Sequence, residues 1–292
     1  MLHYIAKLTS PKRTQESNLH LGLVLSWIAG ALNAGGFLAV GQYTSHMTGI
    51  ISTAADDLVL LRYIPALAAL LMLIAFIAGS ATTALWVNYA KRNSYPLHYS
   101  PVLFLESILL LCFGMLGRGL SQHEFVTVSL TTVLLCYMMG LQNALITKIS
   151  HAEIRTTHVT GLVTDIGIEL GKLFYWNYDK SKDEAAHIRA NRHKLHLHSA
   201  LVLSFFAGGI AGAVGFKYLG FISTVPLSLT LICVGIAPYL DKKKHHLRGG
   251  AINSEINTED KINDLKFIFS PSTTPSLNQN ELESWLTSTH TP

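Results

Sequence analysis

The residues best suited to chemistry are two histidines that stand in two similar motifs. Thr44–Gly49 reads Thr-Ser-His-Met-Thr-Gly, and Thr156–Gly161 reads Thr-Thr-His-Val-Thr-Gly. An imidazole titrates near neutral pH, so it can take up or release a proton under physiological conditions. We therefore treat His46 and His158 as candidate binding or proton-relay residues.

Each motif is predicted to begin a short helix that carries a polar stripe. A helix turns by about 100° per residue, so the positions seven and eleven residues after each histidine lie on its face. Those positions hold Thr53 and Asp57 after the first histidine, and Asp165 and Glu169 after the second. The two stripes together with the motif threonines Thr48 and Thr160 give the predicted substrate- or ion-binding residues: His46, Thr48, Thr53, Asp57, His158, Thr160, Asp165 and Glu169.

A structural interpretation of the same segments stays open. Ser45 and Thr157 are expected to be N-caps, because a hydroxyl before a helix accepts a hydrogen bond from a free backbone N–H. Asparagine and glycine residues of the motifs would then tether a broken helix and allow close packing. The predicted structural residues are Asn33, Gly49, Asn143 and Gly161.

The elements that must position these residues are membrane helices. The chain has 292 residues, of which 49% are hydrophobic and only 14% are charged, whereas soluble domains have about 25% charged residues. Long runs such as Leu21–Ala55 and Tyr63–Ala90 contain no charge and exceed the roughly 20 residues that cross a bilayer. The composition predicts an all-α integral membrane protein with about six transmembrane helices, at 19–41, 64–88, 101–118, 124–147, 199–217 and 220–240.

The two motifs belong to an internal repeat. Gly30–Ala34 resembles Gly140–Ala144, and Ala75–Gly79 resembles Ser204–Gly208, in the same order along the chain. Three spans per copy place the first motif outside and the second inside. We therefore predict inverted repeats, a plan common in secondary transporters, each with a short re-entrant or tilted half-helix.

The distribution of basic residues predicts the topology. Lys and Arg favour cytoplasmic loops, which places both termini in the cytoplasm of a bacterial cell with the protein in its inner membrane. The predicted parts are a cytoplasmic segment 1–18, membrane repeats 19–123 and 124–240, a basic histidine-rich loop 176–198 inside the second repeat, and a polar, disordered cytoplasmic tail 241–292. The alternative is eight spans in parallel repeats, which would move Lys91 and Arg92 outside.

Other features allow two interpretations each. Glu106, in the third span, is expected either to reach the membrane interface or to belong to a transport pathway. Gly208 and Gly212 form a GxxxG-type pair that packs helices within one chain or between chains, so a homo-oligomer stays open. The histidine-rich loop favours contact with anionic lipid heads over metal binding.

The motif segments also resemble the YoaK family of bacterial membrane proteins, a family defined by a domain of unknown function. The resemblance is carried by Asn33, Ser45–Gly49, Met139–Ala144 and Arg155–Gly161, and it covers roughly residues 19–240. It implies about six spans in a bacterial cytoplasmic membrane and no particular substrate. The polar tail and the acidic stretch Ala55–Asp57 depart from it.

The function predicted from these features is a secondary transporter or channel for a small solute, with proton or ion coupling. A membrane scaffold or sensor that acts through the cytoplasmic tail is the alternative. An intramembrane enzyme is disfavoured, because no nucleophile or phosphate-binding motif accompanies the histidines. We expect no catalytic residue, metal or cofactor, and as partners only membrane lipids and the solute, with no nucleic acid.

Overall fold

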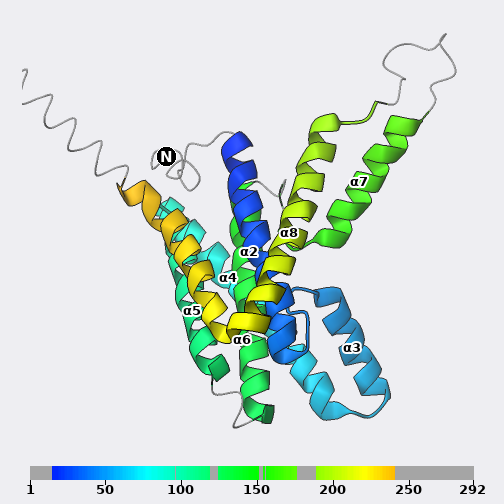
Figure 1. Cartoon of the computed structure of the whole chain (residues 1–292), viewed down its shortest axis with the longest axis vertical. Helices are drawn as coiled ribbons and strands as arrows, with labels where there is room; N and C mark the ends of the chain where they lie inside the picture. Colours follow the sequence, from blue (N-terminus) through cyan, green and yellow to red (C-terminus); the bar gives the residue numbers. More distant parts are fainter. Residues whose placement is uncertain are drawn as a thin grey trace, which may run out of the picture. The chain divides into compact units, whose positions relative to one another are not determined.

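The computed structural model describes residues 15–95, 97–118, 124–150, 154, 156–175 and 189–240, without the side chains of 15, 118 and 124–129. Residues 1–14 of the predicted N-terminal segment, most of the 176–198 loop and the tail lie outside these residues, whereas residues 15–18 of that segment are helical. Within them, the secondary structure is entirely helical (Figure 1). The elements are α2 (Gln15–Val40), α3 (Met47–Val59), α4 (Tyr63–Arg92), α5 (Ser100–Arg118), α6 (Glu124–Ile149), α7 (Val159–Phe174), α8 (Arg192–Leu219), the 3-10 turn η2 (Gly220–Ser223) and a last helix over 224–240.

Five helical stretches among the described residues are long and apolar enough to cross a membrane. They are Glu16–Val40, Tyr63–Arg92, Ser100–Gly117, Leu130–Ile149 and Arg192–Leu240. The last has 49 residues, and a straight helix of that length would extend for about 70 Å, more than twice the hydrocarbon thickness. It is interrupted at Gly220, whose φ of 61° is left-handed, and continues through η2 into the last helix.

The apolar core lies around α2 and α6. Leu25 and Leu32 of α2 and Met138 and Leu145 of α6 are fully buried within one cluster. In contrast, α4 and α8 expose large apolar side chains such as Ile77 and Phe206. In a lipid solvent such surfaces need no protein partner, because lipid tails are as apolar as the side chains.

Helix α2 packs on α8 with backbone-to-backbone contact. Both helices run downward in Figure 1. A side chain on Gly208 would collide with the carbonyl of Trp27, and one on Gly212 with that of Ala31. The GxxxG pair therefore packs helices within this chain, which decides the question that the sequence left open for these two glycines.

Helix α4 packs on α6 in the corresponding way. Both helices run upward in Figure 1, and Gly79 lies against the carbonyl of Tyr137 while Gly140 lies against that of Phe76. Hydroxyls add to the contact, since Thr83 Oγ1 donates to the carbonyl of Leu141 at 3.0 Å. Small residues allow this approach, and the hydroxyl bonds stabilise it in an apolar environment.

Two short helices complete the arrangement. Helix α3 packs on α4, and α7 packs on α8. Figure 1 shows α3 (blue) beside the lower part of the bundle and α7 (green) beside the upper part. With 13 and 16 residues, each is shorter than a full membrane span.

Candidate functional site

The two motif asparagines tie each motif to the helix before it. Asn33 Oδ1 accepts hydrogen bonds from the backbone N–H of Ser45 at 3.3 Å and from its hydroxyl at 2.8 Å. Asn143 Nδ2 donates to Thr157 Oγ1, and Thr156 Oγ1 donates to Asn143 Oδ1 at 3.4 Å. In both copies, an amide inside the long helix holds the chain that turns into the short helix.

The predicted N-caps at Ser45 and Thr157 are wrong. The N-cap residues are His46 and His158, and neither makes a side-chain capping bond. The hydroxyl of Ser45 donates to Asn33, and that of Thr157 accepts from Asn143. These hydroxyls therefore hold the asparagine tethers, and the first turns of α3 and α7 keep free N–H groups.

Each histidine ring folds back over the glycine three residues later. A Cβ atom on Gly49 would lie 2.5 Å from Nδ1 of His46, and one on Gly161 would collide with Nδ1 of His158. The spacing His-x-Thr-Gly thus has a steric reason, because only glycine leaves room for the ring above the first helical turn.

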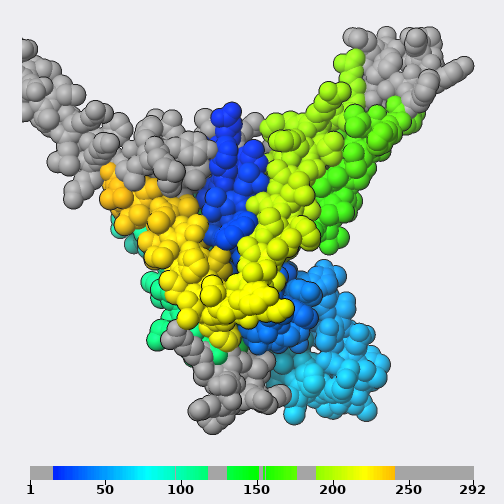
Figure 2. Space-filling view, viewed as in Figure 1, coloured from blue at the N-terminus to red at the C-terminus, as the bar shows by residue number. Residues whose placement is uncertain are grey.

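One cavity joins the two motifs. Its volume is about 650 Å³, and the space-filling view is hollowed between α3 and α7 (Figure 2). The lining residues come largely in matching pairs from the two copies: Asn33 and Asn143, Ser45 and Thr157, His46 and His158, Met47 and Val159, Thr48 and Thr160, and Phe76 and Phe205, with Tyr43 and Thr147 in addition. None of these described residues carries a carboxylate, an ammonium or a guanidinium group.

Two further cavities adjoin this central cavity. One of about 310 Å³ runs along α3 from His46 past Thr53 to Asp57. Another of about 550 Å³ lies between α7 and α8 and extends from His158 to Asp165 and His198. Since His46 and His158 each line the central cavity and one side cavity, the two rings stand where the cavities meet.

The last acid of each stripe binds the start of the next long helix. Asp57 is buried, and its Oδ1 lies 2.7 Å from Nη2 of Arg62, the N-cap residue of α4. Glu169 is also buried, and its Oε2 accepts a 2.7 Å hydrogen bond from the backbone N–H of Asn191, the N-cap residue of α8. Both acids therefore connect a short helix to the following span and lie away from the central cavity.

Glu169 also binds a lysine on its own helix. Lys172 Nζ lies 2.9 Å from Glu169 Oε1. The hydrogen bond from Lys172, together with that from the Asn191 backbone, holds the pKa of Glu169 below its usual value. An ionised carboxylate is the form that both bonds favour.

We expect Arg62→Ala to destabilise the fold more than Asp57→Asn. Loss of Arg62 leaves a buried carboxylate without its cation, whereas loss of the Asp57 charge leaves a guanidinium that is 57% exposed. The expected cost of Arg62→Ala is about 1–2 kcal/mol, below that of a fully buried pair because water screens the arginine. Apparent unfolding temperatures in detergent check this. In a protein that already carries Asp57→Asn, Arg62→Ala should lower the unfolding temperature only slightly further. An equal decrease with and without Asp57→Asn would contradict the pairing.

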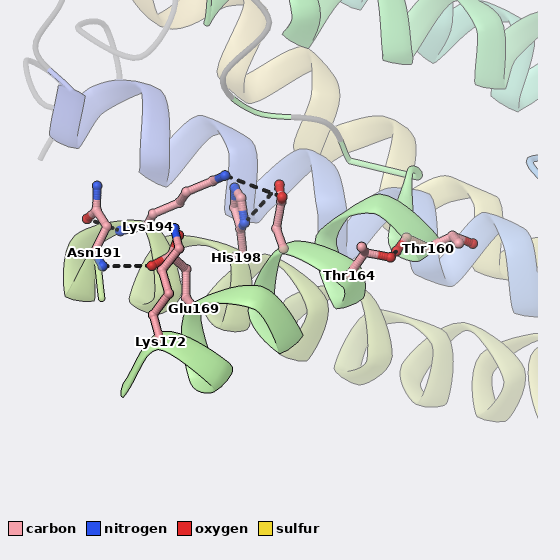
Figure 3. Close-up of polar contacts among 8 residues, drawn as sticks. Thr160, Thr164, Glu169, Lys172, Asn191, Lys194 and His198 are labelled. Carbon is pink, nitrogen blue, oxygen red and sulfur yellow. Dashed lines mark hydrogen bonds and ion pairs between the residues drawn. The ribbon is translucent and has the colours of Figure 1, made fainter. Parts of the chain in front are cut away.

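Asp165 belongs to an ionic cluster with α8. Lys194 Nζ lies 3.3 Å from Asp165 Oδ1, and His198 Nδ1 lies 3.5 Å from Oδ2 (Figure 3). The aligned positions of the first copy hold Thr53, Pro65 and Ala69. The cluster is therefore a property of the second copy alone.

The histidine-rich segment differs from its predicted form. Helix α8 begins at Arg192, so the final residues of the predicted 176–198 loop are helical. His198 is 4% exposed and faces Asp165. Helical phase explains the difference, since His198 falls on the face of α8 that packs against α7.

The sequence did not single out several lining residues. Phe76 and Phe205 line the central cavity at matching positions, and their repetition in the segments Ala75–Gly79 and Ser204–Gly208 was the available signal. No comparable signal marked Tyr43 or Thr147. Arg62 was also not singled out, because its partner Asp57 is reached through the turn after α3.

Comparisons with known proteins agree with the architecture. The family model described as "Protein of unknown function (DUF1275)" matches residues 21–237. The chain is similar to the UPF0700 transmembrane protein YoaK of Bacillus subtilis (strain 168), with 28% identity over 160 residues, or 54% of this chain and 70% of that protein. No solved structure matches. The resemblance stated from the motifs is thus confirmed, and the apolar helices together with this similarity indicate a membrane protein.

Proposed function

Because this chain belongs to the family described as proteins of unknown function (DUF1275), a description that states no activity, we propose a function from its central cavity. The protein is a secondary transporter or channel for a small solute. The observation that carries the proposal is that both motif copies contribute matching residues to one cavity of about 650 Å³. Transporters built from repeats bind their solutes at such a junction, beside broken helices.

The proposal includes six spans in two inverted repeats. Supporting it, α2, α5 and α8 run downward in Figure 1, whereas α4, α6 and the last helix run upward. Each repeat's first helix packs on the other repeat's second helix, α2 on α8 and α6 on α4. The proposal counts the 49-residue stretch as two spans, because the turn at Gly220 interrupts it.

The lining favours an uncharged polar solute or an anion. Amides, hydroxyls and imidazoles offer hydrogen bonds, while Phe76 and Phe205 offer apolar faces. The free N–H groups at the starts of α3 and α7 carry partial positive charge. A cation would find no carboxylate among the described lining residues, because Asp57 and Glu169 are engaged elsewhere.

The side cavities supply a route to the solute site. One side cavity is lined by α3 and the other by α7, and these two helices lie beside opposite ends of the bundle (Figure 1). His46 and His158 stand at the two junctions, so movement of either ring opens or closes one end. An imidazole at a gate can also link opening to proton uptake.

The charge distribution supports termini in the cytoplasm of a bacterial inner membrane. The end of α4, the end of α6 and the start of α8 lie at the upper end of Figure 1, and these helix ends carry Lys91, Lys148 and Lys194. Helix α2 also begins at this end, and the positive-inside rule assigns it to the cytoplasm.

Cysteine accessibility tests the proposal. In a background without Cys112, Cys136 and Cys233, single cysteines replace Thr53 in one side cavity and Thr164 in the other. A membrane-impermeant thiol reagent should label Thr53→Cys only from outside and Thr164→Cys only from the cytoplasm. Labelling of both positions from one side would overturn the inverted arrangement and with it the proposed route.

A further inference from the structure

Glu106 is a buried acid that the central cavity does not use. It lies in the second turn of α5 and is 0% exposed, so the expectation that it reaches the membrane interface is wrong. Neither of its carboxyl oxygens has a hydrogen-bond partner in the part of the chain that the structure describes.

The surroundings offer no counter-charge. Helix α5 packs on α6, on η2, on the last helix through Ser107, and on α8 through the ring pair Phe113–Phe216. The other ionisable groups with described side chains on these elements are Cys112 on α5, Cys136, Tyr137 and Lys148 on α6, Cys233 and Tyr239 on the last helix, and Arg192, His193, Lys194, His196, His198, Lys217 and Tyr218 on α8. None of them is paired with Glu106. An isolated carboxylate in a low-dielectric interior is far costlier than the neutral acid.

Glu106 is adjacent in sequence to a residue that contacts the other repeat. Next to it, the carbonyl of Ser107 accepts a 3.0 Å hydrogen bond from Ser228 Oγ of the last helix. Aligning the third helices of the two copies pairs Ser107 with Ser228 and Glu106 with Leu227. The second copy has a buried apolar residue, Leu227, at the position of Glu106, so the repeat does not require an acid there.

We propose that Glu106 is a proton-binding site. Its carboxyl group holds a proton while α5 is packed against the last helix. The proton leaves to water when these helices separate, and one from water replaces it before they close again. Coupling of solute movement to a proton gradient through Glu106 rests on the proposed function. Proton binding by Glu106 is independent of it.

Infrared spectroscopy of the full chain in lipid at neutral pH tests the proton site. The carbonyl stretch of a protonated carboxyl group should be present in the wild-type protein and absent in Glu106→Gln. The matched control Glu169→Gln should keep this band, because Glu169 is ion-paired. A wild-type spectrum without the band, or a Glu106→Gln spectrum that retains it, would overturn the proposal.

Two further measurements separate folding and coupling from proton binding. Glu106→Leu, which copies the residue of the second repeat, should keep the wild-type unfolding temperature, and Glu106→Gln should elute as a folded protein. In vesicles, a pH gradient should accelerate solute flux through the wild-type protein and leave flux through Glu106→Gln unchanged. Retained acceleration would overturn coupling through Glu106. If the wild-type protein moves no solute, the proposed function fails, and the infrared band still decides whether Glu106 binds a proton.

Discussion

Replacing Gly208 by alanine is expected to lower the apparent unfolding temperature strongly, whereas replacing the adjacent Gly209 is not. A Cβ atom at position 208 would overlap the backbone carbonyl of Trp27 on α2, which has no room to move. Overpacking of this kind costs about 2–3 kcal/mol, or roughly 5–10 °C for a chain of this size. Gly209 has its nearest neighbours at 3.7 Å, so a methyl group fits there.

The pair of variants separates close packing from helix propensity. Alanine favours a helix over glycine by about 1 kcal/mol at either position, so any difference between them reports the contact with α2. Fluorescence-detected thermal unfolding in one detergent measures both. Gly140→Ala on α6 should behave like Gly208→Ala, since it meets the backbone of Phe76. Equal unfolding temperatures for Gly208→Ala and Gly209→Ala would show that α2 and α8 do not approach as closely as described.

The second large effect concerns the central cavity. Thr48→Phe is expected to reduce solute flux to the level of protein-free vesicles, because the bulky ring would project into the cavity beside His46. Thr48 is exposed on the first turn of α3, so the fold should tolerate the larger side chain. The measurement is flux of small neutral and anionic solutes into vesicles that contain the purified protein.

Ser52→Phe is the matched control for this variant. Ser52 lies one turn further along α3, is exposed, and donates its hydroxyl to the carbonyl of Thr48 at 3.0 Å. It is not among the residues that line the central cavity, so its replacement should leave flux near the wild-type rate. Undiminished flux through Thr48→Phe would mean that solute does not pass through this cavity.

The sequence predicted the membrane helices closely because their signal is local. A run without charge must lie in lipid or in protein, so its length alone indicates a span. The spans predicted at 64–88 and 101–118 lie within α4 and along α5. Helix α8 begins seven residues before its predicted span, since its first turns are polar and meet α7 rather than lipid.

The candidate site was only partly predictable. The paired motifs marked His46 and His158 by type and spacing, and both line the central cavity. The same spacing also singled out Asp57 and Glu169 as site residues, but whether an acid faces a solute or a partner depends on what the next helix brings to it. The partners are Arg62 and the backbone N–H of Asn191, and the sequence does not specify how near each helix start lies to these acids.

For this protein, the sequence by itself determined the helical membrane class, the approximate spans and the positions of the two motifs, because hydrophobicity and motif spacing are properties of contiguous residues. The tertiary structure decided that α2 meets α8 and that α6 meets α4, that both motifs share one cavity, that the stripe acids bind helix starts, and that Glu106 is buried without a partner among the described residues. Each of these depends on contacts between residues far apart in the chain. Such contacts are set by how the helices pack, which no local pattern encodes.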